Sequence, residues 1–285
     1  MTTTTPSARA VAPARPKPRR SAGKVALLVL NYSGLLIVLV LLWQWVTTAF
    51  PNRFFPPPLT IVTNSYDMFF TGPPSSLFLT EAMTVDTWGT VSRLLLGFVL
   101  GSAFGILIGM AIGRSLVVRD LTNPIVEFLR SIPATATLPL FIILLGGDDA
   151  MRVAFIAYGV SWFVIINTAA GVSAIHATQI EMGQIFKVSR AGVLFRIVLP
   201  AALPKIFAGL RIAITAALLL AVVSEFILAT NGIGYELVVA QATFALTDMW
   251  SWILLLAILG LILNLLVELV EHNVLRWDRL ARDAG

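Results

Sequence analysis

The chain contains no cysteine and only two histidines among its 285 residues. Without cysteine it can form no disulfide, no thiolate metal site and no cysteine nucleophile. His176 and His272 are isolated and show no ligand spacing, so the sequence predicts no metal site. It also lacks a Gly-x-x-x-x-Gly-Lys-Ser/Thr motif for nucleotide phosphates and shows no nucleophile–base arrangement. We therefore predict no catalytic residues, no bound cofactor and no hydrolysis of ATP by this chain.

Charged residues are also scarce. They make up 12% of the chain and hydrophobic residues 58%, whereas soluble domains carry roughly 25% charged residues. A helical crossing of the bilayer takes about 20 residues, so the composition predicts an all-α integral membrane protein. The net charge of +5 is accounted for by basic residues that mark membrane topology, so we expect no nucleic-acid partner.

About six transmembrane helices are predicted in one domain, residues 25–285. The apolar runs long enough to cross the membrane are 25–48, 88–112, 121–145, 151–174, 206–229 and 250–272. The third run is irregular because it contains three prolines, Pro124, Pro133 and Pro139.

Lysine and arginine gather on one side of these runs. Residues 1–24 contain six of them and no acid, and others follow runs two, four and six. By the positive-inside rule, both termini and the 175–205 loop are predicted to be cytoplasmic. Residues 1–24 cannot bury enough apolar surface to fold, so we expect a disordered basic tail. A cleavable signal peptide is the alternative, but the apolar run after Lys24 is too long for one.

The 175–205 loop contains a basic, amphipathic segment, EMGQIFKVSRAGVLFRIVLP, at residues 181–200. Thr178 and Glu181 match a capping box, which predicts a helix over about 179–187. Ser189 is expected to cap a second helix, in which four apolar residues repeat at helical spacing, Val193, Leu194, Ile197 and Val198.

Two prolines close this segment. Pro200 and Pro204 are expected to end the second helix and to turn the chain into the fifth run. From these features alone, the segment either presents side chains to a soluble partner or lies at the lipid surface without one.

Residues 181–200 resemble the EAA loop of ABC importer permeases, whose pattern is Glu-Ala-Ala, a glycine four residues on, and a closing Leu-Pro. Over residues 93–282 the chain is similar to permeases of the nitrate/sulfonate/taurine importer group. The stretches that carry the resemblance are RLLLG at 93–97, PIVEFLRSIP at 124–133, NTAAG at 167–171, LPAALP at 199–204, GLR at 209–211, EF at 225–226 and LRW at 275–277.

The resemblance implies a type I importer permease of the bacterial cytoplasmic (inner) membrane, paired with a second permease chain that is identical or homologous. It also implies ABC ATPase subunits, which bind the ATP and Mg, and an extracytoplasmic substrate-binding protein. Within the coupling loop, residues 178–200, it assigns ATPase coupling to Glu181, Gly183, Lys187, Ser189, Arg190, Phe195, Leu199 and Pro200.

Two positions of this loop depart from the family pattern. Gly183 replaces the second alanine, and Lys187 replaces the glycine between the two helices. Because glycine enters left-handed conformations at little cost, either the turn shifts to residues 188–189 or the loop docks less typically. This motivates the hypothesis that the chain pairs with a second, more regular permease; a homodimer is the alternative.

The second run carries a glycine at every fourth position. Small residues at this spacing are expected to admit a closely packed helix, and a water path along them is the minor alternative. The five glycines are Gly97, Gly101, Gly105, Gly109 and Gly113.

Candidates for the translocation pathway lie in two places. Glu225 falls in an apolar run, so we expect either a gate or pathway role or an interfacial acid held by a structural hydrogen bond. In the third run the prolines interrupt the helical backbone, and interrupted backbone within the membrane is stable only beside protein or a water-filled cavity. We therefore expect this run to line the pathway; a purely structural kink is the alternative. The candidates there are Arg130, Ser131, Pro133, Thr135 and Thr137.

The sequence thus predicts the permease subunit of an ATP-driven importer, which forms the translocation pathway and couples to a separate ATPase. The alternatives are an ion-coupled secondary transporter and a membrane scaffold subunit without transport. A secondary transporter would normally show several midplane ionisable groups and internal repeats, and neither stands out. The nearly neutral candidate residues do not identify the substrate.

Overall fold

The computed structural model describes residues 22–276, and the chain splits into two compact units after Pro51. The first unit contributes one described helix, α1 (Ala22–Ala49), whose side chains are described from Gly34 onward. The predicted span 25–48 falls in α1. The predicted tail, residues 1–24, lies outside the described residues apart from its last three, which begin α1.

All the regular secondary structure in the described part of the second unit is helical. Its α-helices are α2 (Pro58–Phe70), α3 (Trp88–Arg114), α4 (Leu116–Ser131), α5 (Leu138–Leu145), α6 (Asp149–Ser173), α7 (Ala177–Ile185), α8 (Arg190–Val193), α9 (Leu199–Glu225), α10 (Ile233–Ala242) and α11 (Leu246–Val274).

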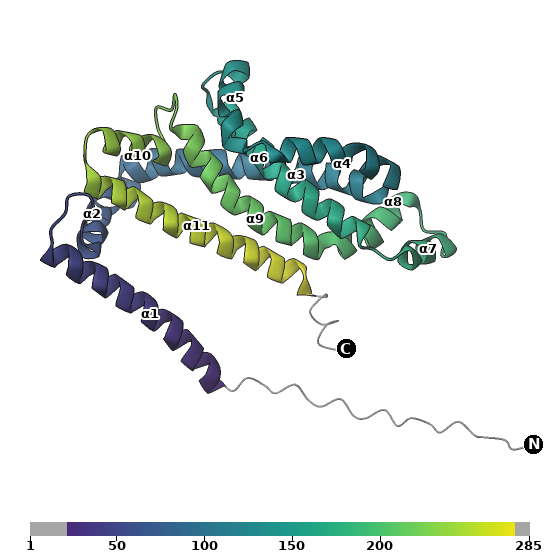
Figure 1. The fold of residues 1–285 in the computed structure, drawn as a ribbon, viewed down its shortest axis with the longest axis horizontal. Helices are drawn as coiled ribbons and strands as arrows, with labels where there is room; N and C mark the ends of the chain where they lie inside the picture. The colour runs from purple at the N-terminus through teal and green to yellow at the C-terminus, as the bar shows by residue number, and fades with distance from the viewer. Residues whose placement is uncertain (1–21, 277–285) are drawn as a thin grey trace, which may run out of the picture. The chain divides into compact units, whose positions relative to one another are not determined.

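Three long helices hold the core of this unit. Helix α6 packs along α3 on one side and α9 on the other, and α11 lies against α9 (Figure 1). The core between them is apolar; Leu94, Phe155, Val160 and Ala217 are fully buried in it. Among the described residues, the four helical runs that contain α3, α6, α9 and α11 are each long and apolar enough to cross a membrane.

The third predicted run, 121–145, is not a single straight helix. Helix α4 and the residues Ala134–Leu145 meet at 83°. The break follows from Pro133, because proline pushes the residue before it out of helical conformation, and Ile132 is extended, with φ −77° and ψ 120°. Counted as one crossing, this bent pair is a fifth span.

Candidate functional site

Residues 177–198 form two short helices joined by a left-handed turn. Helix α7 begins at Ala177, and the N–H of Gln179 donates to the carbonyl of His176 at 3.0 Å. Thr178 therefore lies within the first turn and cannot be the N-cap, so the predicted capping box is wrong. Ser189 caps α8 as predicted, because its Oγ accepts a hydrogen bond from the N–H of Gly192 at 3.1 Å.

The second short helix does not end at Pro200. It continues from α8 through a π-helical turn, Leu194–Val198, into α9, where Pro200 lies in the first turn and Pro204 inside the helix. In a π turn each N–H bonds five residues back, and this wider turn makes room for the proline ring and its missing donor. One helical run therefore extends from Arg190 to Glu225, and it ends at Glu225 rather than at residue 229.

The loop has one buried side and one exposed side. Val193 and Val198 are buried against Val172, Ala202 and Ile206. Of the predicted coupling residues, Gly183 is buried and the rest are partly or fully accessible: Leu199 and Pro200 are half-buried, and Glu181, Lys187, Ser189, Arg190 and Phe195 are exposed. Four large apolar side chains, which we call the exposed face of the loop, point away from the bundle: Met182, Ile185, Phe186 and Phe195, with exposed fractions of 51%, 76%, 77% and 62%.

Gly183 and Lys187 determine how the two helices of the loop pack and where the chain turns between them. Gly183 is buried, and a Cβ there would lie 2.8 Å from Cδ1 of Ile197, so its lack of a side chain permits close contact. Lys187 has φ 52°, and the N–H of Val188 closes α7 by donating to the carbonyl of Gly183 at 2.9 Å. The turn therefore stays at Lys187 and does not shift to residues 188–189.

Replacing Lys187 with glycine is expected to stabilise this turn by about 1 kcal/mol, because a side chain in left-handed conformation costs roughly that much. Hydrogen exchange of the Val188 amide should slow by about fivefold, the factor that corresponds to 1 kcal/mol. Lys187→Ala is the matched control, since it removes the ammonium but keeps Cβ. Equal slowing in both variants would show that charge, and not backbone strain, limits the turn.

The five glycines of α3 face α6. A Cβ on Gly97, Gly105, Gly109 or Gly113 would come within 2.6–2.7 Å of a side-chain Cβ of α6, and one on Gly101 would meet the carbonyl of Ala157. The two helices thus touch backbone to backbone along the whole stripe.

The pathway candidates of the third run lie around its break. Arg130 and Ser131 end α4, Pro133 follows, and Thr135 and Thr137 belong to the 3₁₀ turn Ala134–Thr137. Nε of Arg130 donates to Glu127 at 2.9 Å. Ser131, Pro133 and Thr135 are exposed, whereas Thr137 is half-buried and donates to the carbonyl of Ala134 at 2.7 Å.

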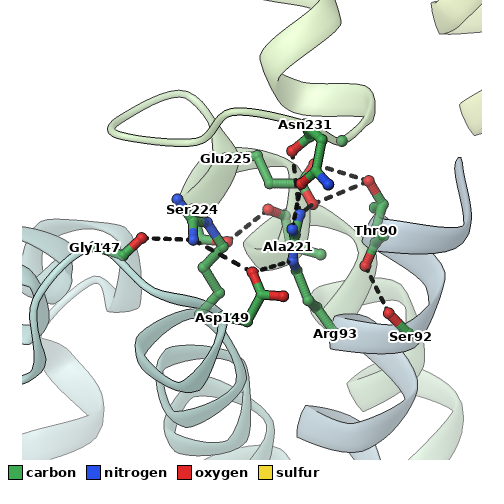
Figure 2. Close-up of polar contacts among 12 residues, drawn as sticks. Thr90, Ser92, Arg93, Gly147, Asp149, Ala221, Ser224, Glu225 and Asn231 are labelled. Atoms are coloured by element: carbon green, nitrogen blue, oxygen red, sulfur yellow. Dashed lines mark hydrogen bonds and ion pairs between the residues drawn. The ribbon is translucent and has the colours of Figure 1, made fainter. Parts of the chain in front are cut away.

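Glu225 is separate from these candidates and belongs to a buried network at the opposite end of the bundle from α7. Its side chain is fully buried. The carboxylate accepts hydrogen bonds from Nη1 of Arg93 at 2.8 Å, from Oγ1 of Thr90 at 2.8 Å and from the N–H of Gly234 at 2.9 Å (Figure 2). Its partners therefore come from α3 and from the start of α10.

Arg93 connects this carboxylate to two further elements. Its Nε donates to Oδ1 of Asp149, at the start of α6, at 2.8 Å. Nη1 also donates to the carbonyl of Asn231 at 3.2 Å, and Nη2 donates to the Asn231 side chain (Figure 2). Arg152, also buried, lies 3.6 Å from Asp149. The guanidinium groups of Arg93 and Arg152 thus balance the charges of the Glu225 and Asp149 carboxylates.

The same network satisfies the free amides at the start of α10, which an α-helix leaves without internal partners. Gly232 donates to Asp86 at 3.0 Å and Ile233 donates to Thr90 at 2.8 Å, while Gly234 donates to Glu225. Gly232 has φ 117°, and a Cβ there would collide with the Glu225 carboxylate. Glu236 lies on the first turn of α10. Its pKa is raised mainly by burial and to a lesser extent by the negative charge of nearby Asp86.

Comparison with known proteins identifies the family. Residues 101–276 match the family described as binding-protein-dependent transport system inner membrane component. The chain belongs to this family. It is the transmembrane permease subunit of an ABC importer of the nitrate/sulfonate/taurine group, so the secondary-transporter and scaffold alternatives are set aside.

Three relatives show how far the similarity of this permease extends. It is 30% identical to the taurine transport system permease protein TauC of Escherichia coli (strain K12), over 86% of this chain and 88% of that one. The putative aliphatic sulfonates transport permease protein SsuC of Bacillus subtilis (strain 168) is 29% identical, over 86% and 87%. The nitrate import permease protein NrtB of Synechocystis sp. (strain ATCC 27184 / PCC 6803 / Kazusa) is 25% identical, over 90% and 95%.

The fold of the permease matches a solved transporter. The MetNI methionine ABC transporter, in an inward-facing conformation, aligns with a TM-score of 0.58 at 16% identity, over 68% of this chain and 96% of that one. This likeness supports the predicted fold class, an all-α, type I importer permease.

Sequence reasoning singled out Glu225 in this permease but missed its partners. A carboxylate in an apolar run needs a basic partner, and Arg93 and Arg152 are the basic residues near the matching ends of runs two and four. This reasoning limits the candidate partners of Glu225 to Arg93 and Arg152. Nothing in the sequence indicates that Thr90, Asn231 and Asp86 complete the network.

Proposed function

We propose that this permease receives work from separate ATPase subunits through the exposed face of the 177–198 loop. In this arrangement the α7 end of the bundle is cytoplasmic, and the ATPases hold ATP and Mg. A second permease chain completes the pathway, and an extracytoplasmic binding protein delivers substrate at the α10 end. Both termini are then on the cytoplasmic side of the bacterial inner membrane.

The observation that carries this proposal is the exposed face itself. Four large apolar side chains at 51–77% exposure lie on two short helices, while the opposite side of the loop is buried in the bundle. Clustered apolar surface rimmed by polar residues marks a protein-binding site. Lys187, Arg190 and Arg196 supply that rim. The loop is also rooted in the 190–225 helical run, so a displacement of its face reaches α9 directly.

The names of the relatives favour a small anion as the substrate. They are called permeases for taurine, aliphatic sulfonates and nitrate, and each of these compounds carries a small oxyanion group. We infer that the substrate of this permease carries such a group and passes residues 130–137.

Truncating the two aromatic rings of the exposed face is the test. Phe186→Ala combined with Phe195→Ala is expected to weaken association with the ATPase at least about thirtyfold, because truncating even one interface anchor costs about 2 kcal/mol. Substrate uptake and binding-protein-stimulated ATP hydrolysis in proteoliposomes should fall together. The folded yield of the permease should not change, since both rings are exposed.

Phe54→Ala is the matched control, because it removes an equally exposed ring, at 60%, from the other end of the bundle. It should leave the association with the ATPase unchanged. Full stimulation of the ATPase by the double variant would contradict the proposed coupling face.

A further inference from the structure

Helix α4 has a charged stripe along one side and an apolar stripe along another. None of its 16 residues is buried in this chain. The polar stripe repeats at helical spacing and consists of Asp120, Asn123, Glu127 and Arg130. The apolar stripe consists of Val117, Leu121, Ile125 and Phe128, exposed at 68%, 69%, 59% and 68%.

The direction of α4 decides what these stripes face. The helix starts at the end of α3, contacts that helix, and in the view of Figure 1 runs back in the direction from which α3 came, so it does not lie across the bundle as a helix flat on the membrane surface would. At about 1.5 Å per residue, Glu127 and Arg130 are about 17 and 21 Å from the start of α4. With the start of α4 at the cytoplasmic face, as the proposed function places it, both residues lie inside a hydrocarbon layer about 30 Å thick.

Ionisable side chains at that depth are stable only where they face water or a protein interior. The apolar stripe needs no such environment and suits lipid or a packed neighbour. We propose that the polar stripe of α4 lines the aqueous route of the permease, beginning at the α7 end and leading to the break at Pro133. This rests on the proposed function, and it adds Asp120, Asn123 and Glu127 to the pathway candidates.

The charges of this lining compensate one another along the helix. Nε of Arg130 lies 2.9 Å from Glu127, and Nε of Arg119 lies 3.8 Å from Asp120. Each cation therefore has its own acid, and the four stripe residues together with Arg119 beside them carry no net charge. Such a lining solvates a small polar ion without holding it, which suits a route in which selection is made elsewhere. The solute class is a small hydrophilic ion, and the stripe itself does not select its sign.

The natural absence of cysteine permits a direct test in the intact transporter complex. Asn123→Cys is compared with Ile125→Cys, which lies at nearly the same depth on the apolar stripe. Both are treated with a membrane-impermeant methanethiosulfonate reagent in proteoliposomes. We expect Asn123→Cys to react at least about tenfold faster, because the reactive thiolate forms in water and is suppressed in an apolar setting. Glu127→Cys against Phe128→Cys is the second pair, for use if either first variant fails to assemble.

The charge balance is tested in the Asn123→Cys background. Glu127→Gln removes a unit negative charge one helical turn away, about 6 Å. The reaction rate with an anionic reagent, divided by the rate with a cationic one, should rise about threefold in a solvated path. An unchanged ratio would mean that the Glu127 charge does not face the route.

Two results would overturn the proposal. One is an equal rate at positions 123 and 125. The other is an Asn123→Cys rate that equals that of the exposed Thr178→Cys and stays constant when the ATPases are trapped with ATP and vanadate, as expected of a surface helix. Failure of the proposed function has a different signature, because the variant with both Phe186→Ala and Phe195→Ala would then keep full uptake and full stimulation of the ATPase while the contrast between the two stripes persisted.

Discussion

Replacing Arg93 with methionine is expected to lower the free energy of unfolding by about 3–5 kcal/mol, the cost of leaving one partner of a buried ion pair alone. The change strands the fully buried Glu225 carboxylate and removes the donors to Asp149 and Asn231. The contacts among α3, α6, α9 and the start of α10 would all weaken. Thermal unfolding of the purified complex should show a midpoint about 10 °C lower, at about 2–4 °C per kcal/mol for a chain of this size.

The double variant separates stranded charge from lost packing. Glu225→Gln keeps an acceptor for Gly234 and Thr90 but removes the charge that Arg93 balances. Arg93→Met combined with Glu225→Gln should therefore be more stable than Arg93→Met alone, with a coupling of about 2 kcal/mol for residues in direct contact. Arg53→Met is the control, because Arg53 is exposed and surface changes stay within about 0.5 kcal/mol. An Arg93→Met variant as stable as this control would refute a structural role for the pair.

Uptake per folded complex then distinguishes the two interpretations of Glu225. If the network only holds α10 in place, the double variant transports in proportion to its folded amount. If Glu225 is a gate, transport is lost even where stability returns. The geometry favours the structural role, because the carboxylate is fully buried and accepts hydrogen bonds from Arg93, Thr90 and Gly234, which belong to other parts of the scaffold.

The features that could be predicted from the sequence depend on local spacing. A glycine at every fourth position lies on one face of α3 whatever packs there, so a contact face is predictable while its partner, α6, is not. Ser189 is predictable as a cap because capping involves only the next three residues. Both predictions depend only on residues that lie within one helix or directly at its start.

The features that could not be predicted depend on distant or competing groups. Arg93 and Glu225 are 132 residues apart, and no spacing connects them. Pro200 is normally a helix breaker, yet the π turn before it accommodates the ring and the helix continues. Lys187 takes the conformation that favours glycine because the packing of Gly183 under Ile197 fixes the turn there. In each case tertiary contacts override a local preference.

The second large effect concerns the contact between α3 and α6. Gly105→Ala combined with Gly109→Ala is expected to destabilise the permease by about 4 kcal/mol, since each overpacking change in a tight contact costs about 1–3 kcal/mol. A Cβ on Gly109 would lie 2.6 Å from Cβ of Thr168 and 2.7 Å from the carbonyl oxygen of Ile165. Neither atom can rotate away, because one is main chain and the other is fixed to it.

The two helices must therefore separate, and the strain reaches other parts of the bundle. Helix α6 packs between α3 and α9, so its displacement disturbs the apolar core and stretches the Arg93–Asp149 pair between α3 and α6. The unfolding midpoint of the complex should fall by about 10 °C. Gly260→Ala is the matched control, because its Cβ would meet only the mobile end of Leu218, at 3.2 Å. Equal losses in the two variants would indicate a general cost of adding a methyl group and would leave no special role for the glycine stripe.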